Sequence, residues 1–307
     1  MVTALLSHPD CWQHINPPGH PEQVARLDAV MAALEGMELA RSDAPLAAES
    51  DILRVHPKRY LDSLRRAEPE EGWRRLDADT QLSPGSLGAA FRAAGAAVKA
   101  VELVLGGEAG NAFVATRPPG HHAERETAMG FCLLSNAAIA AKAALDHLGL
   151  TRVAILDFDV HHGNGTQDCV EDDARIFFAS SHQMPLYPGT GDPSETGEHD
   201  NVLNVALRDG TKGSEIIDIW ARDILPKVRD FSPELLIVSA GFDAHEDDPL
   251  AGLRMRTEDY ATLTGMILDL ADELCGGKLV SLLEGGYDLA ALGESVASHV
   301  GQLKERS

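Results

Sequence analysis

Short aliphatic runs recur along this chain, and each of them ends in a cluster of polar residues and glycine. We predict buried strands from these runs at residues 111–115, 152–158, 235–239 and 279–283, because short apolar runs with such ends are typical of strands covered on both faces. Longer segments with helical spacing lie between and after them, at residues 84–105, 135–148, 214–228, 257–274 and 289–303. This alternation predicts an α/β fold with a mostly parallel central sheet and helices on both faces.

The chain shows no clear division into domains. Its 307 residues, 44% of them hydrophobic, suffice for one large α/β unit with a sizeable core. Residues 185–200, which are rich in proline, glycine and acidic side chains, are expected to form a long functional loop rather than a linker. Residues 68–79 are expected to form a second, charged surface loop. We therefore expect residues 1–307 to form a single domain.

Charge and cysteine usage limit the partners and the compartment. Lys and Arg number 26 against 48 Asp and Glu, a formal net charge of −22, which opposes binding to nucleic acid or to an anionic membrane. The cysteines form no Cys-x-x-Cys pair, so neither a disulfide framework nor a structural zinc knuckle is indicated. No apolar run reaches membrane-spanning length, and the first twelve residues show neither a basic region nor a long apolar core, so we expect neither a membrane span nor a signal peptide. We expect a cytoplasmic protein.

Metal-ligating residue types follow two of the predicted strands. Asp159 and His161 come at the end of the strand predicted at 152–158, and residues two apart on an extended chain share a face, as Asp157 would too. Asp243 follows the strand predicted at 235–239 in the same kind of position. An ion-paired strand end would explain an isolated Asp-x-His pair equally well. Two carboxylates and one imidazole together, however, are typical of a catalytic zinc that keeps a position open for water.

Residues suited to acid/base chemistry follow the other two predicted strands. His121 and His122 come after residues 111–115, behind two prolines and a glycine that restrict the backbone. A single histidine would more often be structural, whereas an adjacent pair indicates proton transfer, with Asp157 and Asn164 available to orient the rings. Tyr287 follows residues 279–283 behind two glycines and is suited to stabilise a developing oxyanion. A packed turn is the alternative for an isolated Gly-Gly-Tyr.

Six ordered motifs between Arg117 and Asp288 resemble those of the histone deacetylase superfamily, and specifically of its bacterial class II-like members. They are RPPGHH, GFCLLSNAA, DFDVHHGNGTQ, YPGTGD, SAGFDAHEDDPL and EGGYD. Upstream, GHPE and DADTQLSPGS extend the resemblance more weakly, so that it covers nearly the whole chain. The resemblance implies the arginase/deacetylase α/β fold and a single catalytic domain over residues 1–307.

The resemblance also implies roles for individual residues. It assigns one zinc ion per chain to three ligands, Asp159, His161 and Asp243. It makes His121 and His122 the general acid/base pair and lets Tyr287 polarise the scissile carbonyl. Asp157 would bond to His121 and, with Ser180, contribute to a structural potassium site. Four residues would line the narrow channel for an acyl-amine substrate: Gly130, Phe131, Tyr187 and Leu250.

Three positions depart from part of that family. Asn164 stands where class I members carry an aspartate, which matches the class II pattern and weakens His122 as the principal base. Tyr187 stands where many relatives have phenylalanine and places a hydroxyl in the channel. Leu250 replaces the glutamate with which polyamine-selective relatives recognise a cationic amine. This replacement favours an acyl-lysine peptide, or another neutral acyl amide, over a polyamine.

The sequence thus predicts a zinc-dependent deacetylase that hydrolyses an N-acyl amide, with acyl-lysine of peptides or proteins as the favoured substrate. An acetylpolyamine or other small-amide amidohydrolase is the nearest alternative, because the same site would serve it. A dinuclear manganese ureohydrolase and a non-catalytic acyl-lysine reader are more distant ones. A homo-oligomer is compatible with the sequence, which does not specify the oligomeric state.

Overall fold

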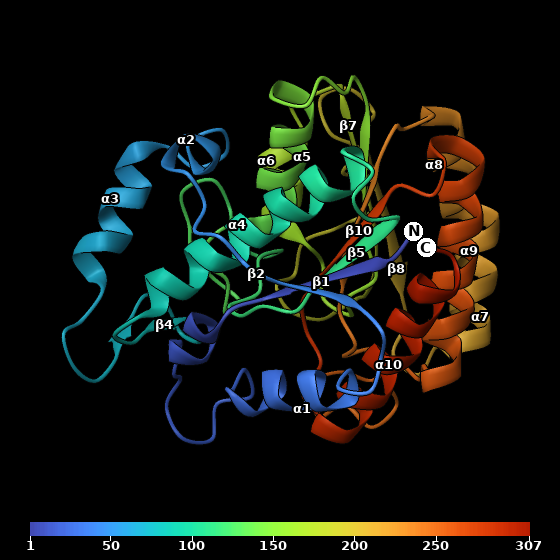
Figure 1. Ribbon diagram of the computed structural model, residues 1–307. Helices are drawn as coiled ribbons and strands as arrows, with labels where there is room; N and C mark the ends of the chain where they lie inside the picture. The colour runs from blue at the N-terminus through green and yellow to red at the C-terminus, as the bar shows by residue number, and fades with distance from the viewer.

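An eight-stranded parallel sheet runs through the centre of the computed structural model, which describes residues 1–307 (Figure 1). Its strand order is β2-β1-β5-β10-β9-β6-β7-β8. The strands are β1 (Thr3–Ser7), β2 (Ala40–Asp43), β5 (Asn111–Val114), β6 (Val153–Asp157), β7 (Ile176–Gln183), β8 (Val202–Leu207), β9 (Leu236–Ala240) and β10 (Leu279–Leu283). A separate antiparallel hairpin pairs β3 (Arg74–Arg75) with β4 (Gln81–Leu82).

Helices cover both faces of the sheet, and short helical turns connect some of the elements (Figure 1). The α-helices are α1 (Ala25–Ala33), α2 (Glu49–Ile52), α3 (Lys58–Ala67), α4 (Ser86–Leu105), α5 (Asn136–Asp146), α6 (Asn164–Val170), α7 (Gly213–Ile219), α8 (Leu225–Phe231), α9 (Thr257–Cys275) and α10 (Leu289–Glu305). The turns are the 3-10 helix η1 (Pro9–Gln13) and the π-helix η2 (Trp220–Ile224). The predicted α/β fold with helices on both faces is confirmed.

Two hydrophobic clusters lie on opposite faces of the sheet, because successive side chains of a strand point to opposite sides. In β6, Val153 and Ile155 belong to the cluster that packs under α4 and α5. Ala154 and Leu156, between and beyond them, belong to the cluster under α9 and α10. This double burial explains why the central strands are apolar at nearly every position.

The four strands predicted from the aliphatic runs are present as β5, β6, β9 and β10, with ends that differ by no more than one residue. Residues 214–228 lie in one continuous helical segment, but the π-helical turn η2 interrupts its α-helical geometry between α7 and α8. Pro226 explains the interruption, since proline has no N–H to donate within a helix. The segment 68–79 forms a surface loop, as expected, except that Arg74 and Arg75 make up β3 of the hairpin.

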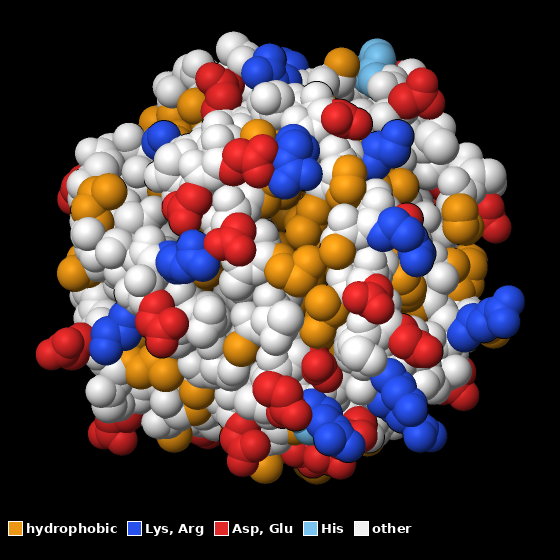
Figure 2. Space-filling view, turned by 90° about the vertical axis from the view of Figure 1, so that its right-hand side faces the viewer, with side chains coloured by type: hydrophobic (Ala, Val, Ile, Leu, Met, Phe, Trp, Pro, Cys, Tyr) orange, Lys and Arg blue, Asp and Glu red, His pale blue; other side chains and the backbone are white.

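The surface and the thiols agree with a folded globular chain. Figure 2 shows acidic and basic side chains interspersed, with smaller apolar patches, on the face that lies to the right in Figure 1. No helix combines the length and the apolar character needed to cross a membrane. The cysteines are all buried free thiols: Cys11, Cys132, Cys169 and Cys275.

Candidate active site

The predicted site residues come from four strands that are neighbours at the centre of the sheet, in the order β5-β10-β9-β6. Each of these strands is followed by one of the polar clusters, and parallel strands place their carboxyl ends at the same edge. His121 follows β5, Tyr287 follows β10, Asp243 follows β9, and Asp159 and His161 follow β6. The fold therefore gathers at one edge residues that are up to 166 positions apart in the sequence.

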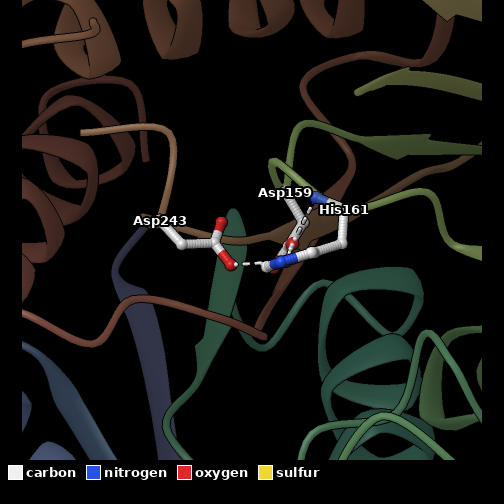
Figure 3. A group of neighbouring side chains, drawn as sticks. All are labelled: Asp159, His161 and Asp243. Carbon is white, nitrogen blue, oxygen red and sulfur yellow. Dashed lines mark hydrogen bonds and ion pairs between the residues drawn. The ribbon is translucent and has the colours of Figure 1, made fainter. Parts of the chain in front are cut away.

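Asp159, His161 and Asp243 form the one group of metal-ligating side chains whose donor atoms converge (Figure 3). One ligand atom from each lies within 4.8 Å of the others. Nδ1 of His161 is 3.1 Å from Oδ1 of Asp159 and 3.1 Å from Oδ2 of Asp243. Tetrahedral zinc with its usual bond lengths keeps its ligand atoms about 3.3 Å apart. The donor set and its spacing fit such an ion.

The backbone around the triad produces this convergence in a way that differs from the predicted strand alternation. Strand β6 ends at Asp157, so Asp159 and His161 lie in the turn that follows it. Oδ1 of Asp159 accepts the backbone N–H of His161 at 2.9 Å, a side-chain turn that folds the imidazole back onto the carboxylate. Oδ2 of Asp159 accepts the N–H of Gly285 at 2.8 Å, and a Cβ at this glycine would stand 2.1 Å from Oδ2 of Asp243.

The charges of the triad favour a bound cation. All three side chains are more than nine-tenths buried, at 0, 7 and 0% exposure in sequence order. Burial opposes the charged form of His161, but hydrogen bonds to Asp159 and Asp243 outweigh it and raise its pKa to about 10. A proton on His161 therefore compensates part of the negative charge here. A divalent metal would take over this compensation and release the proton.

The two histidines that follow β5 have different hydrogen-bond partners. Nδ1 of His121 lies 3.0 Å from Oδ2 of Asp157, whereas Nδ1 of His122 lies 2.8 Å from Oδ1 of Asn164. The amide nitrogen of Asn164 donates to Glu124 at 2.9 Å. Because Oδ1 can only accept, Nδ1 of His122 must carry its proton, which leaves Nε2 without one in the neutral ring.

Because their surroundings differ, the pKa values of His121 and His122 are shifted in opposite directions. Burial would lower the pKa of His121, but the charges of Asp159 and Asp157 hold it well above its usual value. Burial lowers the pKa of His122 well below its usual value, and the neighbouring His121 and His161 lower it further. The rings stand 4.0 Å apart between centroids. At neutral pH the pair therefore combines one charged acid with one neutral base.

Tyr287 is held by its backbone and by its ring. Its N–H donates to Oδ2 of Asp248 at 2.8 Å, the Arg26 guanidinium carbon lies 4.9 Å from the ring centroid, and Phe131 packs edge-on at 5.9 Å. Burial raises the pKa of the phenol well above its usual value, as does the charge of Asp243. The hydroxyl therefore keeps its proton at neutral pH and remains a hydrogen-bond donor.

A narrow cavity of about 220 Å³ joins these groups to the surface. His122, His161 and Tyr287 line it, together with all four residues predicted for the channel: Gly130, Phe131, Tyr187 and Leu250. Leu186 and Asp79 line it as well. Asp79 was not predicted, although it lies in the segment DADTQLSPGS, because an exposed-looking loop carboxylate gives no sign of its proximity to a distant cavity.

A buried ionic cluster beneath the site was also missed. Glu22 receives hydrogen bonds from Nη2 of Arg117 at 2.6 Å and from Nη1 of Arg26 at 3.1 Å. Arg26 in turn donates to the carbonyl oxygens of Glu284 and Gly286, at 2.5 and 2.6 Å. The cluster ties the loops after β5 and β10 to the N-terminal segment. A Glu and an Arg four residues apart suggest a solvated helix face, so the burial of Glu22 and Arg26 was not apparent from the sequence.

The buried side chain of Glu284 fixes the turn that carries the histidine pair. Its Oε2 accepts the N–H groups of Gly120 and His121 at 2.7 and 3.2 Å, and Oε1 accepts the hydroxyl of Ser239 at 3.0 Å. Burial raises the pKa of this carboxyl to about 7. Its place in the motif EGGYD, three residues before Tyr287, was the available sequence indication.

The two residues predicted for a potassium site are neighbours across the sheet. Asp157 on β6 pairs in register with Ser180 on β7. The hydroxyl of Ser180 lies 2.9 Å from Nδ1 of His182, and both side chains are buried.

Comparison with known proteins places the chain in a family. The family model described as "Histone deacetylase domain" matches residues 20–303. The histone deacetylase-like amidohydrolase of Pseudomonas aeruginosa is 39% identical over 288 residues, which cover 90% of this chain and 75% of the relative. The rice protein named histone deacetylase 10, chloroplastic, is 39% identical over 305 residues, which cover 92% of this chain and 69% of the relative.

A solved structure agrees with these sequence matches over almost the whole chain. The crystal structure of the HDA15 HD domain superposes with a TM-score of 0.92 at 32% identity, and the match covers 98% of this chain and 90% of that one. The rice relative is named as a histone deacetylase and the Pseudomonas relative as a histone deacetylase-like amidohydrolase. The chain therefore belongs to the histone deacetylase family of hydrolases.

Proposed function

We propose that the protein is a zinc-dependent deacetylase that hydrolyses an N-acyl amide, with acyl-lysine in a peptide or protein as the favoured substrate. One observation carries the proposal: the converging donor atoms of Asp159, His161 and Asp243 adjoin the cavity that His122 and Tyr287 line. Ligands, a proton acceptor and a hydroxyl donor thus surround one small space, as amide hydrolysis requires.

Zinc suits the three side chains better than a harder cation does, because the set includes an imidazole and leaves one position open. When bound, the ion would act as a Lewis acid and lower the pKa of a water molecule in the open position. Two carboxylates moderate this effect, so the chain's own donors and bases must contribute. A dimanganese ureohydrolase would need a second set of ligands, and one converging group is found.

The remaining groups account for the movement of protons and charge. Although Asn164 makes His122 a weaker base than an aspartate would, His121 is already protonated beside Asp157, so Nε2 of His122 would accept a proton from the attacking water as its oxygen bonds to the acyl carbon. The hydroxyl of Tyr287 would donate to the carbonyl oxygen as that oxygen gains negative charge. The C–N bond then breaks, and the amine nitrogen takes a proton from the histidine pair. The products are a carboxylic acid and a free amine, and the charged His121 favours the anionic transition state.

The shape of the cavity supports a slender substrate. Phe131 and Tyr187 supply aromatic walls and Leu250 an aliphatic rim, which suit the methylene chain of an acylated lysine. One observation favours the alternative, an acylpolyamine: Asp79 is the only carboxylate that lines the cavity. It stands in a different segment from Leu250. Turnover of N-acetylputrescine in preference to an acetyl-lysine peptide would favour this second function.

We propose further that residues 1–307 act as a single catalytic domain in the cytoplasm, with neither nucleic acid nor membrane as a partner. The net charge of −22 supports the exclusion of polyanions. We also propose a structural potassium ion near Asp157 and Ser180, which the register of β6 and β7 supports. It would fix the turn that presents Asp159 and His161.

The purified protein is expected to contain one zinc ion per chain and to hydrolyse a fluorogenic acetyl-lysine peptide. A chelator should remove both the metal and the activity, and added Zn²⁺ should restore them, because only the ion supplies the Lewis acid. Elemental analysis and initial rates on the same samples measure this. Two manganese ions per chain would contradict the proposal, as would full activity in metal-free protein. Tight binding of the peptide without turnover would instead indicate a non-catalytic reader.

Replacing Asn164 with aspartate is expected to move the acid limb of the pH profile of kcat/KM upward by about one pH unit or more. In the wild-type protein, Oδ1 of Asn164 lies 2.8 Å from Nδ1 of His122. A carboxylate in the same place would favour the protonated imidazole and raise the pKa of His122. Because His122 must be unprotonated to act as a base, activity would be lost at a higher pH on acidification.

Glu124→Gln supplies the control of opposite sign. This change removes the carboxylate that accepts from Asn164 and should move the acid limb slightly downward. Rates measured from acid to neutral pH with each variant, together with the zinc content, test the assignment. If the acid limb of kcat/KM lies at the same pH in both variants and in the wild type, the protonation of His122 does not control that limb.

A further inference from the structure

Trp73 and Ile15 form an exposed apolar surface, which we call the Trp73 shelf. Their side chains are 48 and 49% exposed. The indole N–H donates to the carbonyl oxygen of Ile15 at 2.8 Å, so the edge of the ring is fixed while its face remains open. Tryptophan is usually largely buried, and this one stands in a mostly charged segment, EPEEGWRRLDAD.

The β3–β4 hairpin connects the shelf to the mouth of the cavity. Arg74 pairs with Leu82 and Arg75 with Gln81, which places Trp73 at the open end of the hairpin. Asp79 lies in the turn at the other end and lines the cavity. About three residues separate the two ends along a strand, a distance of about 10 Å. In Figure 1, the carboxyl end of β1 points toward the side of the molecule on which β4 lies.

The chain from Ile15 to His20 makes a second connection that runs beside the hairpin. The N–H of Ile15 donates to Oγ of Ser83 at 2.9 Å, beside the open end of the hairpin. At the other end, Nε2 of His20 lies 2.9 Å from the carbonyl oxygen of Asp79, and its ring packs edge-on against Phe131 at 4.8 Å. Two anchored segments therefore hold the shelf at a fixed distance from the channel wall.

We propose that the Trp73 shelf binds an apolar side chain of the substrate peptide, about three residues from the acylated lysine. The inference rests on the proposed deacetylase function. An extended peptide advances about 3.3 Å per residue, so its third neighbour on one side reaches the shelf when the acyl-lysine occupies the cavity. A polyamine carries no such side chain. The shelf therefore specifies a peptide or protein substrate.

The surface between the shelf and the cavity limits the intervening residues of the peptide. Asp77 and Asp79 occupy the tip of the hairpin, and Oδ1 of Asp77 accepts the N–H groups of Asp79 and Thr80 at 3.0 and 2.6 Å. These carboxylates would repel acidic residues next to the acyl-lysine and favour neutral or basic ones. The occupant is thus a neutral or basic acyl-lysine peptide with an aliphatic or aromatic residue about three positions away.

The zinc-loaded enzyme and its Trp73→Ala variant would be compared on three substrates. These are an acetyl-lysine peptide with leucine at the third position on both sides, the same peptide with serine there, and a capped single acetyl-lysine. We expect the variant to lose about tenfold in kcat/KM on the leucine peptide, as for removal of an aromatic contact. The other two substrates should change by less than about twofold. Trp73→Phe should retain most of the rate on the leucine peptide.

Leu148→Ala is the matched control. Leu148 is an exposed apolar residue, 38% accessible, and it precedes β6, whereas the candidate site lies at the carboxyl ends of the strands. This substitution should change none of the rates. Equal losses on all three substrates with Trp73→Ala, or none on the leucine peptide, would overturn the inference. Fluorescence anisotropy of the labelled leucine peptide is measured in parallel. If Trp73→Ala weakens peptide binding but neither protein hydrolyses the peptide, only the proposed function is wrong. If both proteins bind the peptide equally well, the proposed role of the Trp73 shelf is wrong.

Discussion

Asp243→Asn is expected to reduce deacetylation by about a thousandfold or more, since the Lewis acid contributes several kcal/mol to the transition state. The variant keeps the side-chain volume and the acceptor for the N–H of Val160, which now donates to Oδ1 at 2.9 Å. The variant removes one of the two carboxylate charges that would balance the charge of Zn²⁺. The new amide nitrogen would also face Nδ1 of His161, where Oδ2 now stands at 3.1 Å. By donating a hydrogen bond to Nδ1 of His161, this nitrogen would make that ligand atom unavailable to the metal.

Zinc content and kcat/KM on the acetyl-lysine peptide measure this result. Asp247→Asn is the matched control, because Asp247 lies in the same loop with its side chain 70% exposed. That control should retain both zinc and activity. A thermal melt of each protein would exclude unfolding as the cause. Stoichiometric zinc together with wild-type turnover in Asp243→Asn would show that the ion is bound elsewhere.

Tyr287→Phe is expected to lower kcat by about 10²- to 10³-fold, the usual effect of removing one oxyanion donor. Phenylalanine keeps the packing against Phe131 and the contact with Arg26, so the loop after β10 should stay in place. The missing hydroxyl matters most when the carbonyl oxygen becomes an anion. KM and zinc content should therefore change little, and the loss should appear in kcat.

Tyr187→Phe is the natural comparison, because both tyrosines line the same cavity. Tyr187 belongs to the channel wall, and its ring lies 5.2 Å from that of His122 between centroids. Its hydroxyl is assigned no part in the reaction, so kcat should fall by less than about threefold. If the two variants lose activity to the same extent, or if Tyr287→Phe raises KM instead of lowering kcat, the oxyanion role is wrong.

The four central strands were predicted from the sequence, whereas the outer strands β1, β2, β7 and β8 were not. β5, β6, β9 and β10 are apolar on both faces, so their burial is visible in a short window of sequence. The edge strand β2 consists of four exposed residues, ARSD, with no apolar pattern. It exists because it pairs with β1, from Ala4 with Ala40 to Ser7 with Asp43. Pairing of this kind depends on a partner distant in the chain.

Asp159, His161 and Asp243 converge as the sequence predicted, but the reason for the convergence was incomplete. Strand alternation suggested that Asp159 and His161 share a face, yet both lie beyond the end of β6. A side-chain hydrogen bond from the N–H of His161 to Asp159 brings them together instead. The spacing Asp-x-His permits both arrangements. Three-dimensional contact with Asp243 and Gly285 selects the turn.

The sequence by itself determined which chemical groups stand at the ends of the central strands, because each strand and its polar end are contiguous in the chain. Only the tertiary structure decided that β5, β10, β9 and β6 are neighbours, which brings those groups within bonding distance. It also made His121 and His122 chemically different, although they are adjacent, since their partners Asp157 and Asn164 come from other elements. Burial and long-range charge set these properties, and neither is encoded in a local pattern.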